Sequence, residues 1–250
     1  MEMTTFVQRM GRNDAKLVGR DQFMIGLIGY PILNLLVLRY GIPPLTDWAL
    51  TRFDFDLVPY YGVIVSYAMI VMIPMFMGMV FGLLLIEERD DDTLTAMMVT
   101  PVSLDRFVLY RILAAVFVSF GMMLLFVPYV GIVEIPFWKL VPIVLVATAT
   151  APLTALIFFS LADNKVQAFG VLKALSTLNL VPAIAWFVPE PWQWLLGLYP
   201  PYWAIKSFWV AIEPAASAVG FLLWLLPAFV LYPVVLKWLI NRFRAKAYAG

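Results

Sequence analysis

The chain has 250 residues, of which 63% are hydrophobic and only 13% are charged, and its formal net charge is +1. A soluble domain cannot cover its surface with so few charges and so much Leu, Val, Phe and Trp, so the composition indicates an integral membrane protein. The sequence contains no cysteine and no histidine, which excludes disulfides, thiol catalysis and the usual zinc and iron ligand sets.

The long apolar segments predict helices rather than a closed barrel, because they are continuously apolar and do not alternate with polar residues. Six of them approach the ~20 residues needed to cross a hydrocarbon core of ~30 Å. The predicted spans are Gln22–Leu38, Val58–Ile86, Ile112–Val133, Leu140–Ala162, Phe169–Val188 and Ala216–Ile240. Six prolines fall in or near these spans and are expected to distort the helices, namely Pro31, Pro74, Pro128, Pro152, Pro182 and Pro227.

The chain shows no repeat and no linker that would separate two domains. We therefore predict one all-α membrane domain covering residues 1–250. Residues 1–21 would form a cytoplasmic helix, residues 22–240 a six-span bundle, and residues 241–250 a cytoplasmic tail. The first twenty-one residues do not resemble a signal peptide, because basic residues are spread through them and no apolar core precedes a cleavage site.

The N-terminal segment is amphipathic at helical spacing. Its apolar arc consists of Phe6, Val7, Met10, Leu17 and Val18, and its basic arc of Arg9, Arg12, Lys16 and Arg20. Asp14 is an exception, because this acid lies on the apolar arc. Such a helix can lie along the inner leaflet, either as a basic anchor or with its bases against an acidic protein surface, for which the acidic residues 87–92 are one candidate.

The basic residues predict the orientation of the bundle. With a cytoplasmic N-terminus, the inside segments carry thirteen of the seventeen Lys and Arg residues and the outside segments carry four. Because cytoplasmic loops carry the excess of basic residues, we expect both termini to be cytoplasmic in a multi-pass protein of the cell membrane.

A charged insert, Glu87–Ser103, separates the second and third predicted spans and reads EERDDDTLTAMMVTPVS. The acidic run 90–92 precedes Thr93, an arrangement that favours the start of a helix because carboxylates stabilise its positive end. Downstream, Leu94, Met97 and Met98 recur at helical spacing and form one apolar stripe before Pro101 ends the helix. The stripe would either dock on a soluble partner or pack back onto the membrane domain.

The pattern of the insert resembles that of a known family. Glu-Arg, then Thr-Leu, then Val-Thr-Pro-Val-Ser between the second and third spans is similar to the membrane subunits of the ABC type-2 exporter permeases. Members of that family usually have Gly before the Thr-Leu pair, where this chain has Asp92. The six spans, the basic N-terminal helix and the aromatic outer segment agree, so the resemblance covers essentially the whole chain. Permeases for the export of fluoroquinolones or other drugs are among the similar proteins.

The resemblance implies that the insert forms a short coupling helix, residues 93–100, which docks on an ABC ATPase. The residues assigned to this coupling are Glu87, Glu88, Arg89, Asp92, Thr93, Leu94, Met97, Met98, Thr100 and Pro101. Glu87 and Glu88 would lie near the N-terminal helix, where its bases could pair with them. The chain lacks a G-x-x-x-x-G-K-[ST] loop, so we expect no enzymatic activity or cofactor of its own, and a separate ATPase would bind ATP and Mg²⁺.

The segment Pro191–Glu213 is rich in aromatic residues, namely Trp192, Trp194, Tyr199, Tyr202, Trp203, Phe208 and Trp209. Aromatic rings with polar tips favour the headgroup level of a membrane. We predict two short helices at the outer interface. They could be re-entrant and act as a gate, or they could be an aromatic belt that anchors the last span.

By the resemblance, the first, second and fifth spans line the substrate pathway. The candidate pathway residues are Asn34, Ser66, Tyr67, Met69, Met72, Ser176, Thr177 and Asn179. The methionines suit variable apolar ligands or ordinary packing, and the polar groups could equally make interhelical hydrogen bonds. Gly78 and Gly82 form a G-x-x-x-G that permits close helix approach, as in a dimer seam.

We therefore expect the permease subunit of an ATP-driven exporter, which moves a drug or lipid by alternating access. It would work as a homodimer or heterodimer of permeases with two ATPase subunits. The alternative is a stand-alone secondary transporter or channel, but ion-coupled carriers place carboxylates or histidines deep in the membrane. Here Lys173 is the only charge well inside a predicted span. A membrane enzyme would have only a Ser-Lys arrangement with Lys173 to use.

Overall fold

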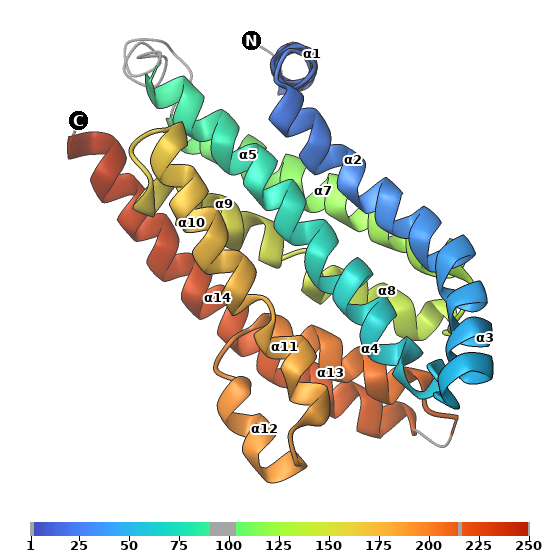
Figure 1. Ribbon diagram of the computed structural model, residues 1–250. Helices are drawn as coiled ribbons and strands as arrows, with labels where there is room; N and C mark the ends of the chain where they lie inside the picture. The colour runs from blue at the N-terminus through green and yellow to red at the C-terminus, as the bar shows by residue number, and fades with distance from the viewer. Residues whose placement is uncertain (1–2, 91–103, 215–216, 250) are drawn as a thin grey trace.

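The computed structural model describes residues 3–90, 104–214 and 217–249. These residues form a bundle of helices, and none of them belongs to a strand (Figure 1). Helices dominate because lipid offers no hydrogen-bond partner to a backbone outside a helix or a closed barrel. The helical elements are α1 (Met3–Val18), α2 (Gln22–Leu36), η1 (Val37–Gly41), α3 (Ile42–Phe53), η2 (Val58–Tyr60), α4 (Tyr61–Val65), η3 (Ser66–Val71), α5 (Met72–Asp90), α7 (Leu104–Val130), α8 (Phe137–Ala147), α9 (Thr150–Leu161), α10 (Lys165–Leu178), α11 (Val181–Ile184), η4 (Ala185–Phe187), α12 (Glu190–Leu196), α13 (Pro201–Ile212) and α14 (Ala218–Ala249).

Among the described residues, six helical stretches are long and apolar enough to cross a membrane. They are Gln22–Phe53, Val58–Arg89, Phe107–Val130, Phe137–Leu161, Val166–Phe187 and Ala218–Phe243. The six predicted spans are confirmed in number and order. The first is longer than predicted, because the chain stays helical through η1 and α3 to Phe53 instead of ending near Leu38.

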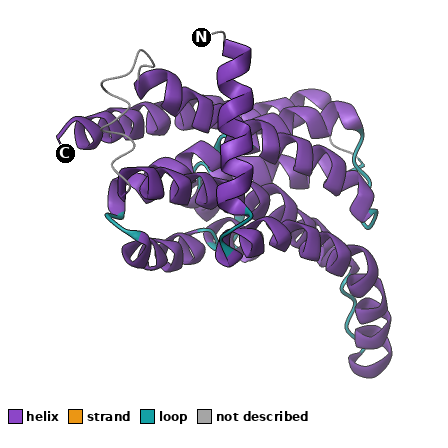
Figure 2. Ribbon diagram, turned by 90° about the horizontal axis from the view of Figure 1, so that it is seen from above, coloured by secondary structure: helices purple, strands orange, loops and turns teal. Residues whose placement is uncertain are grey.

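Both chain ends lie at one end of the bundle, together with the last turn of α5 and the first turn of α7 (Figure 1). We call this the termini end, and we call the opposite end, which carries α3 and α12, the distal end. Helix α1 is seen end-on in Figure 1 and along its length in Figure 2, so it runs nearly at right angles to the spans. This orientation suits the predicted amphipathic helix, which would lie along a membrane surface.

Several spans are distorted just before a proline, as predicted. The π-helical turn η3 precedes Pro74, and breaks at Thr148–Ala149 and Asn179–Leu180 precede Pro152 and Pro182. Proline lacks the backbone N–H and its ring clashes with the carbonyl one turn earlier. A wider turn or a break removes that clash, which explains why regular helix stops there.

The second span lies at the centre of the bundle. Within its most apolar window 94% of the residues are buried, against 22–28% for the first, third, fifth and sixth spans. Helix α5 packs on α9 through Gly78 and Gly82. A Cβ atom at Gly78 would lie 2.6 Å from the Cβ of Thr154, and one at Gly82 would lie 2.8 Å from the Cβ of Phe158. The G-x-x-x-G pair therefore forms a seam inside one chain, and not the dimer seam considered from the sequence.

The aromatic segment divides into two parts. Helix α12 carries Trp192 and Trp194, which are 64% and 58% exposed, whereas α13 buries Trp203 and Trp209 against α14, α8 and η3. Burial raises the pKa of Tyr202 to about 12, so its hydroxyl keeps its proton. That hydroxyl lies 3.0 Å from Oε1 of Gln193 and donates to it, which ties α13 to α12. The interpretation as an interfacial belt fits α12 only, because the rings of α13 belong to the core.

Candidate functional site: the charged cluster at the termini end

The candidate site is the last turn of α5, which leads directly into the predicted coupling segment. Here Glu87, Glu88 and Arg89 follow an apolar run, and residues 91–103 lie outside the described part of the chain. The remaining predicted coupling residues, Asp92, Thr93, Leu94, Met97, Met98, Thr100 and Pro101, fall in that undescribed range. Two consecutive side chains at the end of α5 make contacts to opposite sides.

The first contact is a buried cluster around Arg111 of α7. Nη1 of Arg111 lies 2.6 Å from Oδ1 of Asp14 on α1, and Nη2 donates to Oε1 of Glu88 on α5. The hydroxyl of Tyr110 donates to Oδ2 of Asp14 at 2.8 Å. The guanidinium of Arg111 also lies 5.2 Å from the ring centroid of Phe107. We call Asp14, Glu88, Tyr110 and Arg111 the Arg111 cluster, and it joins three helices.

All three charged members of the Arg111 cluster are removed from solvent. Arg111 is 1% exposed, Asp14 7% and Glu88 6%. Buried charges are tolerated only when they are paired, because desolvation costs several kcal/mol for each isolated ion. Arg111 is the only base among them and serves two acids, so each acid depends on it.

The cluster explains the acid on the apolar arc of the N-terminal helix. Asp14 faces α7 because its partners Arg111 and Tyr110 lie there. Sequence reasoning expected bases of this helix to pair with Glu87 and Glu88, but Glu88 pairs with Arg111 instead.

The predicted bases of the N-terminal helix lie elsewhere. Arg12 and Lys16 are exposed, and the side chain of Arg9 lies outside what the structure describes. Arg20 and Glu87 line the same surface hollow of about 450 Å³, which brings one predicted pair into one place.

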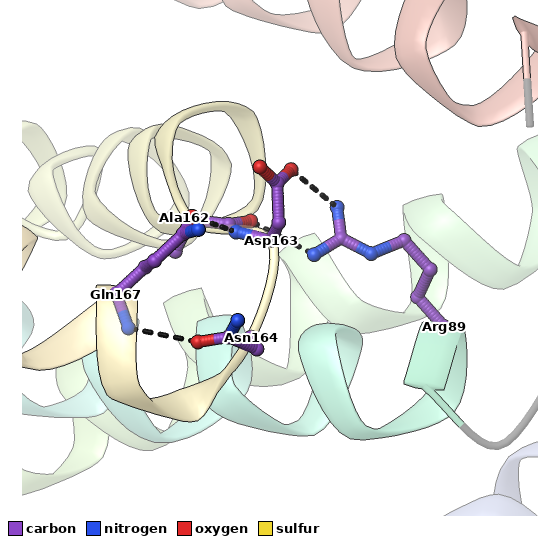
Figure 3. Close-up of polar contacts among 5 residues, drawn as sticks. All are labelled: Arg89, Ala162, Asp163, Asn164 and Gln167. Atoms are coloured by element: carbon purple, nitrogen blue, oxygen red, sulfur yellow. Dashed lines mark hydrogen bonds and ion pairs between the residues drawn. The ribbon is translucent and has the colours of Figure 1, made fainter.

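The second contact is made by Arg89, which reaches the turn between α9 and α10 (Figure 3). Its Nη2 donates to the carbonyl oxygen of Ala162 at 2.8 Å, and its Nη1 lies 4.0 Å from Oδ1 of Asp163. Ala162 caps the C-terminal end of α9, where carbonyl groups lack helical partners and a cation is stabilising. In the same turn, Oδ1 of Asn164 accepts from the backbone N–H of Gln167 and starts α10.

Glu88 and Arg89 thus hold the end of α5 from two sides. Glu88 connects it to α1 and α7, and Arg89 connects it to α9 and α10. A displacement at the end of α5 therefore acts directly on four other helices.

The predicted pathway residues fall into two groups. The first group has internal partners. Oγ of Ser66 accepts from Nε1 of Trp209 at 2.8 Å, and the amide of Asn179 donates to the carbonyl of Leu175 and accepts from the hydroxyl of Tyr199. Met69 and Met72 are also buried inside the chain.

The second group is more accessible. Asn34, Tyr67 and Ser176 are half-buried, and Thr177 is exposed on α10 near the exposed Lys173, whose carbonyl accepts from the hydroxyl of Thr177 at 3.0 Å. Polar groups rarely face lipid within a span, so this side of α10 is suited to contact water or another protein surface.

The fold defines a multi-pass helical membrane protein, with charged contacts gathered beside the connector between its second and third spans. Residues 14–241 match the family described as Fluoroquinolones export permease protein Rv2686c-like, and the chain belongs to this family. Two relatives are the Fluoroquinolones export permease proteins MT2760 and Rv2686c of Mycobacterium tuberculosis, strains CDC 1551 / Oshkosh and ATCC 25618 / H37Rv. Each is 33% identical over 240 residues, which cover 94% of this chain and 93% of the relative.

Proposed function

We propose that this chain is the membrane-spanning permease subunit of an ATP-driven exporter in the cell membrane. It would move apolar or amphipathic compounds, fluoroquinolone drugs among them, out of the cytoplasm. The family membership supports export, and the names of the relatives supply the drug class. A separate ATPase, which binds ATP and Mg²⁺, would supply the energy.

The coupling proposal rests on two contacts at the end of α5, immediately before residues 91–103. Glu88 pairs with Arg111, and Arg89 donates to the carbonyl of Ala162. A soluble ATPase that pushes on this segment would displace the end of the most buried span. Since Arg111 and the α9–α10 turn are attached to the same helical turn, the push would reach the third, fourth and fifth spans together. This arrangement supports alternating access, in which the spans change their relative tilt around a central cavity.

A second permease copy, identical or related, would complete the pathway. Three of the four accessible polar residues, Asn34, Ser176 and Thr177, lie on α2 and α10, which belong to two of the least buried spans. Near the termini end these two helices meet through Phe23 and Phe169, whose ring centroids are 4.9 Å apart. We infer that the face formed by α2 and α10 turns toward the partner permease and the substrate.

The proposed orientation places the termini end in the cytoplasm. Of the four bases assigned to the outside, two are buried with partners in the same chain. Nζ of Lys139 donates to the carbonyl of Ala211 at 2.9 Å, and Nζ of Lys206 donates to Glu190 at 3.0 Å. When these two paired bases are set aside, the excess of Lys and Arg residues at the termini end over the distal end is larger still, as expected for the cytoplasmic side.

Co-purification tests the coupling to an ATPase. The full chain would be purified in mild detergent from the membranes of its own host, and bound proteins would be assayed for ATP hydrolysis. We expect an ATPase with the wild type and its loss in Leu94→Asp/Met98→Asp. The matched control is Leu195→Asp/Leu198→Asp, because these leucines are 62% and 78% exposed at the distal end. If no ATPase accompanies the wild type, the stand-alone transporter or channel becomes the better assignment.

Transport tests the export step itself. Inverted membrane vesicles that hold the chain and its ATPase should accumulate a fluoroquinolone when ATP is added. Accumulation should survive an uncoupler that collapses the proton gradient. Uptake that needs the gradient and not ATP would contradict the proposal.

A further inference from the structure

A groove of about 510 Å³ lies between α9, α10 and α14, on the side toward the termini end. Its walls are almost entirely apolar, with Arg242 as the only charged residue. The lining residues are Ile157, Ser160, Leu161, Gly170, Val171, Ala174, Leu175, Leu178, Trp238, Leu239 and Arg242. The function proposed above uses none of these residues, so the groove has no role in it.

The groove has the length of one lipid leaflet. Along α10 it extends from Gly170 to Leu178, which at 1.5 Å per residue is roughly 12 Å. Half of a ~30 Å hydrocarbon core is ~15 Å. A single acyl chain that descends from the membrane surface would therefore run along the whole groove.

A cation stands at the surface end of the groove. Arg242 is the lining residue nearest the C-terminus of α14, and it therefore lies toward the termini end. Its guanidinium carbon lies 5.6 Å from the ring centroid of Trp238, which also lines the groove, and Trp238 is 58% exposed. Within the described ranges no carboxylate forms an ion pair with Arg242. A guanidinium without an acidic partner is suited to bind a phosphate oxygen.

The groove borders the polar side of α10 but does not include it. At about 100° per residue, Val171, Leu175 and Leu178 centre roughly 150° from the side that carries Lys173 and Thr177, and the small residues Gly170 and Ala174 lie between the two. The polar side suits water or a partner permease, and the apolar side centred on Val171, Leu175 and Leu178 suits lipid.

We propose that the groove binds one acyl chain of an anionic phospholipid, with the phosphate at Arg242. The apolar walls supply the contact for the chain, and Arg242 supplies the preference for a net negative headgroup. The occupant comes from the leaflet at the termini end, so the site is independent of the coupling to an ATPase. Failure of one proposal therefore leaves the other intact.

Native mass spectrometry of the full chain in detergent tests the site, with phosphatidylglycerol and phosphatidylcholine added at equal concentration. We expect the wild type to retain one phosphatidylglycerol with a preference of about fivefold, the effect of one basic residue near a membrane surface. Arg242→Gln should abolish the preference. Lys237→Gln is the control, because it removes an exposed base from the same helix outside the groove.

Gly170→Leu tests the acyl-chain part of the site. A Cβ atom at Gly170 has no neighbour within 4 Å, so a larger side chain fills the groove without displacing the helix. Retention of either lipid should fall in this variant. Gly121→Leu on α7 is the matched control, because Gly121 also has no neighbour within 4 Å and lies outside the groove.

Three results would overturn the proposal. One is unchanged lipid retention in Gly170→Leu, and another is an unchanged preference in Arg242→Gln. The third is a shift in the ratio of monomer to dimer in Gly170→Leu without any loss of lipid, which would assign the groove to a second copy of the chain.

Discussion

Both ends of the bundle hold a base against a carboxylate, but the two pairs differ in exposure. At the termini end, Arg111 and its partners Asp14 and Glu88 are all buried. At the distal end, the side chain of Lys206 is 10% exposed, but that of Glu190 is 73% exposed. Removal of the base therefore leaves two unpaired acids inside the protein at one end and a hydrated acid at the other.

The other contacts at the two ends differ in a similar way. The termini end is held by charges that depend on each other and that lie beside the predicted coupling segment. Besides the Lys206–Glu190 pair, the distal end is held by separate hydrogen bonds and by aromatic contacts, such as that between Trp186 and Trp209 with ring centroids 4.9 Å apart. A strongly coupled cluster transmits a displacement, whereas independent contacts can be changed one at a time. The termini end is therefore suited to transmit a displacement, and single substitutions at the distal end are expected to have smaller effects.

The largest effect is expected for Arg111→Met. Both Asp14 and Glu88 lose their base while they remain buried, and breaking such a pair typically costs roughly 3–5 kcal/mol. Thermal or SDS-induced unfolding of the detergent-solubilised chain measures the loss. Arg12→Met, at an exposed position on α1, should stay within about 0.5 kcal/mol of the wild type.

The triple variant Asp14→Asn/Glu88→Gln/Arg111→Met separates charge from packing. It removes the unpaired acids, so it should regain most of the stability that Arg111→Met loses. If the triple variant is as unstable as the single one, lost packing and not lost charge is the cause.

A smaller effect is expected at the distal end for Trp209→Phe. The substitution keeps an aromatic ring but removes the N–H that donates to Oγ of Ser66 at 2.8 Å. The loss of one buried hydrogen bond is worth about 1 kcal/mol. A double-mutant cycle with Ser66→Ala isolates this term, and strictly additive effects of the two substitutions would contradict a direct interaction.

The smallest effect is expected for Lys206→Met. Glu190 remains hydrated when its partner is lost, so the free energy of unfolding should fall by less than about 1 kcal/mol. The same unfolding assay at low and high salt tests whether exposure of Glu190 explains the small effect. Because salt screens an exposed ion pair, the stability difference between wild type and variant should shrink at high salt. A loss as large as that of Arg111→Met would remove the contrast between the two ends.

The sequence predicts the elements of this fold better than it predicts the contacts between them. The spans follow from hydropathy, and the distortions follow from Pro74, Pro152 and Pro182, because both signals are local. Asp14 stands out in the sequence as an acid on an apolar arc. Its partner Arg111 is 97 positions away, and nothing in the local pattern points to it. A buried acid at a helical position that should be apolar is nevertheless a signal that a base lies opposite.

The packing partners of apolar residues were harder to predict for a different reason. In a membrane protein, the side of a helix that faces lipid is as apolar as the side that faces protein. The sequence therefore could not tell whether Gly78 and Gly82 approach α9 or a second chain, nor that the rings of α13 are buried while those of α12 are exposed.

The close approach at Gly78 and Gly82 has a mechanical consequence. Thr154 and Phe158 of α9 lie so close to Gly78 and Gly82 that a larger side chain at either glycine would collide with them. If α5 slid along α9 by one residue, a larger side chain of α5 would take the place of each glycine and would collide with α9. Helices α5 and α9 are therefore expected to move as one rigid unit. The π-helical turn η3 lies where α5 joins α4, so the regular hydrogen-bonding pattern of the span changes there. When the end of α5 is displaced, we therefore expect α5 and α9 to tilt together and not to slide past each other.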